Sequence, residues 1–217
     1  MKIALTLLLA LFGASSVAQA QELKGDAAAG AKLNASCIGC HGIPGYQSSF
    51  PEVHKVPMIS GQNAKYIAAA LNAYKKGDRK HPSMRAVAAS LSEQNIADLA
   101  AYYAAHGAPL TVPDTAAVQP TPEVAALLAK GACVSCHGAN FSKPIDGAYP
   151  KIAGQFPDYL FTALKSYKAE ANPNVGRNNA IMVGQVKQFS NAELKALAAY
   201  LGSLPAEMRT VAQSKFR

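Results

Sequence analysis

Apolar residues recur at helical spacing in two distant stretches of the chain. Each stretch places apolar side chains at positions i, i+3, i+4 and i+7, which lie on one face of a helix. These residues are Ile96, Leu99, Ala100 and Tyr103 in the first stretch and Leu194, Leu197, Ala198 and Leu201 in the second. Ser92 and Ser190 precede them as candidate N-caps, Ser190 and Glu193 form a capping box, and Gly107 is placed to end the first helix.

Four further helices are predicted from the same kind of pattern. They cover residues 26–36, 64–75, 123–132 and 158–168. Because runs of β-branched residues are few, no strand is needed, and the chain is predicted to be all-α.

The chain contains an internal repeat. In the first copy the repeated positions are Cys37, Gly61, Gln62, Tyr66, Leu71, Tyr74, Lys75, Arg79, Met84, Leu99 and Tyr102. In the second copy they are Cys133, Gly154, Gln155, Tyr159, Leu164, Tyr167, Lys168, Arg177, Met182, Leu197 and Tyr200. The order is kept and the spacing changes only twice, so we interpret the chain as a tandem duplication with two differences in loop length.

A proline-rich stretch separates the two copies, with prolines at 109, 113, 120 and 122. Such a stretch does not continue a helix and is typical of an extended linker. We therefore predict a first domain at 21–108, a linker at 109–120 and a second domain at 121–217.

The first twenty residues have the pattern of a cleaved secretory signal. Lys2 precedes an apolar run at 3–12, and small residues end at Ala18-Gln19-Ala20, so cleavage is expected before Gln21. A membrane anchor is the alternative, but the run is shorter than the roughly 20 residues that span a bilayer. The mature protein is therefore predicted to be soluble, without a transmembrane segment, and periplasmic.

The composition is basic, with a formal net charge of +8. Lys and Arg do not form a run interleaved with aromatic residues, and an exported protein rarely meets nucleic acid, so no nucleic-acid partner is expected. The excess is larger in the second half, which suits an acidic protein partner. Aromatic residues make up 7% and Trp is absent, so two small domains would have thin cores that a large apolar cofactor would fill.

The pentads Cys37-Ile38-Gly39-Cys40-His41 and Cys133-Val134-Ser135-Cys136-His137 carry the chemistry. In a CxxCH pentad two thiols attach to the vinyl groups of one porphyrin, and the adjacent imidazole faces the iron. Two covalently bound haem c groups are therefore predicted, with His41 and His137 as proximal iron ligands. Three alternatives compete with haem attachment. A disulfide in each pair does not account for the histidine that follows, and a thioredoxin-like site requires a βαβ pattern that is missing here. Zinc held by both CxxC pairs is the third alternative.

The sixth ligand is argued from the second copy, whose single histidine is already the proximal ligand and whose cysteines are both used. Methionine is the usual remaining choice. Met182 and Met84 occupy equivalent positions and are predicted as ligands, whereas Met208 has no methionine counterpart. In the first copy Met58 and His81 are rivals, and Met58 aligns with a lysine.

Three histidines and two arginines each have more than one possible role or a structural one. His54, His81 and His106 have no counterparts in the second copy, and a lone histidine is more often at the surface or structural. Arg79 and Arg177 are either solvated charges or partners of a haem propionate, which a guanidinium binds bidentately.

With these motifs the chain resembles the dihaem cytochrome c4 family over nearly its whole predicted mature length. The marks are the two CxxCHG sites, the P-x-[IL]-x-G-Q segments at 57–62 and 150–155, a Tyr-rich helix after each, the ligand Met and the closing helix. The resemblance implies two tandem cytochrome c domains about a pseudo-twofold axis, with facing propionates and electron delivery to a membrane oxidase. Residues 43–56 depart from the family, because they lack its glycine-rich loop.

Taken together, these features predict an electron carrier and not an enzyme. His/Met ligation fills both axial positions, so the iron exchanges electrons with redox partner proteins, among them a membrane-bound terminal oxidase. The alternative is a dihaem electron-transfer subunit of a dehydrogenase or flavocytochrome complex. A monomer is expected, because the duplication already supplies a two-domain interface.

Overall fold

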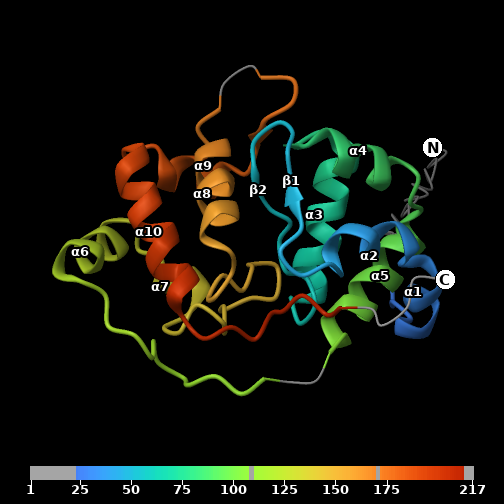
Figure 1. Cartoon of the computed structure of the whole chain (residues 1–217), viewed down its shortest axis with the longest axis horizontal. Coiled ribbons are helices and arrows are strands. Elements are labelled where there is room, and N and C mark those ends of the chain that lie inside the picture. The colour runs from blue at the N-terminus through green and yellow to red at the C-terminus, as the bar shows by residue number, and fades with distance from the viewer. Residues whose placement is uncertain (1–22, 108–109, 170–171, 213–217) are drawn as a thin grey trace, which may run out of the picture.

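The structure is a computed structural model that describes residues 23–107, 110–169 and 172–212. The predicted signal at 1–20 lies outside these residues. The described chain forms ten helices and four two-residue strands (Figure 1). The first half contains α1 (Ala27–Leu33), α2 (Ala35–His41), β1 (Gln47–Ser48), β2 (His54–Lys55), α3 (Ala64–Lys76), β3 (Arg79–Lys80), α4 (Pro82–Ala89) and α5 (Glu93–Ala105). The second half contains α6 (Pro122–Lys130), α7 (Val134–His137), α8 (Pro157–Ser166), β4 (Gly176–Arg177), α9 (Ala180–Val186) and α10 (Asn191–Ser203).

The two halves form separate cores that lie side by side, with α1–α5 on the right of Figure 1 and α6–α10 on the left. In the first half α1 and α3 pack on α5 around Ile67, Leu99, Ala100 and Tyr103. Gly30 allows the close approach of α1 to α5, because a Cβ there would lie 2.2 Å from the carbonyl oxygen of Asp98.

The second half repeats this architecture with α6 and α8 packed on α10. Its core is larger and contains the aromatic residues that the first core lacks, Phe141 and Phe189, beside the buried Leu194 and Leu197. These apolar faces are the ones that the i, i+3, i+4, i+7 pattern predicted. The all-α tandem fold is confirmed.

Both closing helices begin at the predicted serine caps. Ser190 Oγ accepts from the Glu193 amide at 3.2 Å while Glu193 accepts from the Ser190 amide at 2.6 Å. Ser92 forms the same reciprocal arrangement with Asn95, at 3.1 Å in both directions. The second capping box was not predicted, because Asn at this position is a less common partner than Glu or Gln.

Three of the predicted helices are wrong in detail. The helix predicted at 26–36 is divided at Asn34, whose side chain donates to the Tyr102 hydroxyl at 2.8 Å, and a second helix continues from Ala35 to His41. The helices predicted at 123–132 and 158–168 end two residues earlier, at Lys130 and Ser166.

The expectation that strands are unnecessary is also wrong. β1 pairs antiparallel with β2 within a hairpin, and β3 pairs antiparallel with β4 across the two halves, with Arg79 opposite Arg177. Two-residue strands have no sequence pattern of their own, so only the tertiary structure reveals them.

Two glutamines join the halves reciprocally. Gln62 accepts from the Lys151 amide at 3.0 Å and donates to its carbonyl at 2.9 Å. Gln155 holds the amide and carbonyl of Met58 in the same way, at 3.0 and 2.9 Å. Each glutamine of a P-x-[IL]-x-G-Q segment therefore binds the backbone of the other such segment, which explains why both copies carry it.

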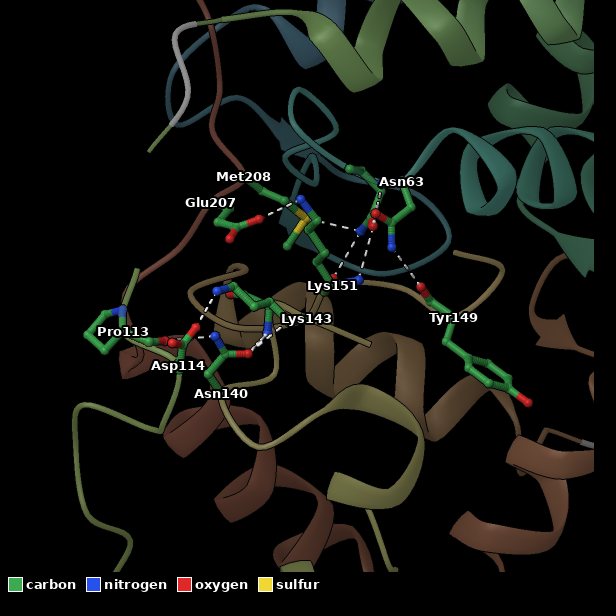
Figure 2. A network of polar contacts seen from close by, with 11 residues as sticks. Asn63, Pro113, Asp114, Asn140, Lys143, Tyr149, Lys151, Glu207 and Met208 are labelled. Carbon is green, nitrogen blue, oxygen red and sulfur yellow. Dashed lines mark hydrogen bonds and ion pairs between the residues drawn. The ribbon is translucent and has the colours of Figure 1, made fainter. Parts of the chain in front are cut away.

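The segment after α10 also crosses to the first half, where the Arg209 amide donates to the Ser60 carbonyl at 3.0 Å (Figure 1). Figure 2 shows the neighbouring contacts: Lys151 pairs with Glu207 at 2.5 Å, and Met208 lies beside them. The Met208 sulfur accepts from Gln62 at 3.1 Å. These contacts fix the relative position of the two halves.

The described part of the linker, from residue 110, contains no helix or strand before α6. It is fastened to the second half, because Asn140 donates to the Pro113 carbonyl at 2.7 Å and Tyr200 donates to the Val118 carbonyl at 3.0 Å. Within the described ranges, no helix has the length and apolar character needed to cross a membrane.

Candidate haem-binding sites

A cavity of about 560 Å³ runs through both halves of the protein. All eight predicted site residues line it: Cys37, Cys40, His41 and Met84 from the first half and Cys133, Cys136, His137 and Met182 from the second. The structure therefore brings together every residue that the sequence singled out for haem attachment and ligation.

The two histidines have the same orientation. Nδ1 of His41 lies 2.8 Å from the Pro57 carbonyl oxygen, and Nδ1 of His137 lies 2.9 Å from that of Pro150. A carbonyl oxygen only accepts, so each Nδ1 carries the proton and each Nε2 keeps its lone pair. Burial lowers the pKa of both imidazoles, although these hydrogen bonds oppose the shift. Both rings are therefore neutral, and each has a lone pair on Nε2 that can bind a metal.

Met84 is the third residue of α4, and Met182 is the third residue of α9. The backbone amide of each methionine donates to the side chain of the residue three positions earlier. Asn179 Oδ1 accepts from the Met182 amide at 3.1 Å, and His81 Nδ1 accepts from the Met84 amide at 3.5 Å. His81 thus has a capping role equivalent to that of Asn179. Sequence comparison missed this equivalence because the residue types differ, although the positions align.

No sulfur–sulfur bond joins Cys37 to Cys40 or Cys133 to Cys136, so neither pair forms a disulfide. Burial raises the pKa of the Cys37 and Cys133 thiols, which keeps them protonated and argues against a thiolate redox centre. The zinc alternative also lacks a donor set, because no group of three or more His, Cys, Asp or Glu in residues 23–107, 110–169 and 172–212 is arranged to hold a metal.

The rival ligands have other contacts. Met208 is 2% exposed and does not line the cavity. Met58 lines it, but its backbone is held by Gln155. His54 donates from Nδ1 to the Glu52 carbonyl at 2.9 Å, and His106 bonds to Ser60 Oγ at 2.9 Å.

A positively charged cluster lies where the cavity passes between the halves. Arg79 donates to the hydroxyls of Tyr66 at 3.4 Å and Tyr159 at 3.3 Å, and Arg177 donates to Tyr159 at 3.0 Å. Burial alone would raise the pKa of Tyr159, but the two guanidinium groups lower it to about 8. The local field therefore strongly favours a negative charge.

The cluster tests whether a haem fits the cavity. Neither arginine forms an ion pair with a carboxylate of the described residues, and Arg79 Nε is buried with no partner among them. Arg79 is buried and Arg177 is half-buried, and two like charges in such a position are costly without a counter-ion. The carboxylates of a bound haem would supply that charge, and the thiol, imidazole and thioether donors match its other requirements. The residues present fit the group.

Comparison with known proteins agrees with this geometry. The cytochrome c family model matches twice, at residues 27–105 and 123–205. Cytochrome c4 of Azotobacter vinelandii is 31% identical over 93% of this chain and 98% of its own. The thiosulfate dehydrogenase electron acceptor of Stutzerimonas stutzeri is 28% identical over 78% of this chain and 79% of its own.

Solved structures show the same fold. Reduced recombinant cytochrome c4 from Pseudomonas stutzeri superposes with a TM-score of 0.59 at 27% identity, covering 83% of this chain and all of that one. Both cytochrome c domains are therefore present in the arrangement of known dihaem proteins. The chain belongs to the cytochrome c4 family and is a dihaem electron-transfer cytochrome with two covalently attached haem c groups.

Proposed function

We propose that this cytochrome carries single electrons between respiratory proteins in the periplasm and delivers them to a membrane-bound terminal oxidase. The observation that supports this most is the equivalence of the two sites, each with a neutral histidine and a capped methionine on the same cavity. Ligation by a histidine and a methionine from the protein would leave no position at either iron for a substrate. A carrier requires this property.

The proposed roles follow the repeat. Cys37 and Cys40 attach the first haem, and Cys133 and Cys136 attach the second. His41 with Met84, and His137 with Met182, would ligate the two irons. When bound, each haem supplies one electron by alternating between ferric and ferrous iron.

The surrounding groups would tune this chemistry. The hydrogen bonds from His41 to Pro57 and from His137 to Pro150 orient each Nε2 and strengthen its donation. The methionine thioether favours the ferrous state and raises the potential. Arg79 and Arg177 would pair with the haem propionates, because neither has a carboxylate partner in the described residues.

Export is supported by the basic start, apolar run and Ala18-Gln19-Ala20 pattern of the first twenty residues. The donor and acceptor proteins are then periplasmic proteins or membrane complexes that face the periplasm. The basic second half favours an acidic docking surface on the partner.

A second candidate is an electron-transfer subunit of a dehydrogenase. It is supported by the likeness to the thiosulfate dehydrogenase electron acceptor. Both candidates use the same two sites, and they differ in whether the cytochrome leaves its partner between electron transfers.

One experiment separates them. In the first measurement, the native protein is isolated from its own cells and its size is measured by gel filtration in low salt. In the second, the reduced protein is mixed with oxidase-containing membranes in a stopped-flow instrument, and its reoxidation is followed. A free monomer that is reoxidised rapidly, with the reaction blocked by cyanide, supports the carrier. A stable complex with a large dehydrogenase, without reoxidation by membranes, supports the subunit.

A further inference from the structure

The loop that departs from the family pattern, residues 43–56, forms a hairpin. Gln47 pairs with Lys55 and Ser48 with His54, and the Val56 amide donates to the Tyr46 carbonyl at 2.8 Å. One side of the hairpin lines the cavity, through residues that include Tyr46, Ser48 and His54. The hairpin is therefore a wall of the first haem site.

The same hairpin reaches into the second half and binds α8. Glu52 pairs with Lys165 at 2.9 Å and accepts from Thr162 Oγ1 at 3.4 Å. Glu52 lies in the loop before β2, and Lys55 lies in β2 itself. Asp158 accepts from the Lys55 amide at 2.9 Å and pairs with the Lys55 ammonium at 3.9 Å. In Figure 1 β2 lies directly beside α8.

The contacts fix one arrangement of the hairpin on the helix. Asp158, Thr162 and Lys165 are spaced i, i+4 and i+7, so they share one face of α8. The two ion pairs have opposite polarity, with Glu52 facing a lysine and Lys55 facing an aspartate. A shifted hairpin would bring like charges together, so the pattern selects a single register.

The second copy contains no corresponding hairpin. Its equivalent segment, 138–149, forms turns and bends without a strand. Two ion pairs with α8 thus hold the wall of the first site, whereas the segment 138–149 receives a single hydrogen bond from Asn63 of the first half, to the Tyr149 carbonyl at 3.2 Å.

We propose that Glu52 and Lys165 are positioning residues of a cross-domain clamp, which holds the hairpin Tyr46–Val56 closed over the first haem site and keeps its potential high. This inference rests on the proposed haem sites. Closure excludes water from the first site, and water favours the more charged ferric state. The second domain therefore sets the potential of the first haem through α8.

Charge reversal tests the clamp. The variants are Glu52→Lys, Lys165→Glu and the double exchange Glu52→Lys/Lys165→Glu, each produced as the full dihaem protein. Asp114→Lys is the matched control, because it reverses one charge of the Asp114–Lys143 pair, whose partners lie in the linker and the second half (Figure 2). Each potential is measured by titration and assigned to its domain from the haem methyl resonances in NMR spectra.

The clamp predicts that both single reversals lower the potential of the first haem and speed amide exchange in the hairpin and α8, although Glu52→Lys adds positive charge and Lys165→Glu removes it. A direct charge effect would shift that potential in opposite directions in the two variants, and this result would overturn the clamp. The double exchange restores both, and Asp114→Lys changes neither. An unchanged first potential in the single variants, or a double exchange that restores nothing, overturns the clamp. A wild-type protein without two low-spin haems would contradict the proposed sites instead, so the two failures are distinguishable.

Discussion

Arg79 and Arg177 lie opposite each other in the β3–β4 pair, and both guanidinium groups donate to the hydroxyl of Tyr159. Each arginine comes from a different half, so the duplicated positions meet at the boundary. Arg79 also stacks on the ring of Tyr74, with its Cζ 4.6 Å from the ring centroid. The site thus combines a buried and a half-buried positive charge with aromatic surfaces and a phenol.

Removing one of these charges should lower both reduction potentials. In Arg177→Gln the loss of a positive charge stabilises ferric iron by on the order of 1–2 kcal/mol, the size expected for a unit charge roughly 10 Å away in an effective dielectric of about 20. Arg177→Lys should lower them less. Redox titration measures the change, with the exposed Arg85→Gln as the control. Potentials that stay unchanged in Arg177→Gln would show that the arginine does not face the haem propionates.

Replacing a ligand should affect one haem at a time. Met182→His should lower the second potential by a sizeable part of the range of about 0.8 V that axial ligands cover, because imidazole favours ferric iron more than a thioether does. Met84→His should do the same for the first haem. Met208→Leu is the control, since this methionine packs against Gln62 away from the cavity. An unchanged second potential in Met182→His excludes that methionine as the ligand.

The reciprocal glutamines should stabilise the interface. In Gln155→Ala the Met58 amide and carbonyl lose their partners, and each buried unpaired group costs about 1–3 kcal/mol. Denaturant unfolding followed by circular dichroism measures the loss. Gln188→Ala should stay close to wild type, because this exposed side chain donates only to Gln185 among the described residues. Equal stabilities of the two variants would mean that the interface does not depend on Gln155.

His106 should make stability depend on pH. Burial lowers its pKa, and Arg209 lowers it further. The unfolded chain then binds more protons than the folded chain at acid pH, so this contribution to stability is lost as the pH falls below about 6.5 and is constant above it. The ring is only half-buried, so the effect should stay below about 1 kcal/mol.

Unfolding free energies at pH 5 and pH 7.5 measure this dependence. In His106→Gln the difference between the two values should shrink. A difference of the same size in the variant would assign the pH dependence to other groups.

Local patterns predicted much of this molecule. The capping box at Ser190 and Glu193, the apolar face of α10 and the two CxxCH pentads depend on residues close together in the chain. The duplication then allowed Met84 and Met182 to be selected together, and the structure brings both to the cavity.

The contacts between the halves could not be predicted in the same way. Arg79 and Arg177 are strand partners that lie far apart in the sequence, so no local pattern predicts their pairing. The hydrogen bond between Gln62 and the Lys151 backbone forms only when the two halves associate. The repetition of Gln62 as Gln155 was the available signal. It marked the position as structurally important without indicating which backbone each side chain binds.

The most direct test of two His/Met haems is an absorption spectrum of the purified protein, oxidised and reduced, with and without carbon monoxide. The account predicts two low-spin haems, a methionine-to-ferric-iron charge-transfer band that is lost in part in Met84→His and in part in Met182→His, and no change with carbon monoxide. A high-spin fraction or a clear carbon monoxide shift would contradict it, because one iron would then have an open sixth position and the protein would be suited to catalysis.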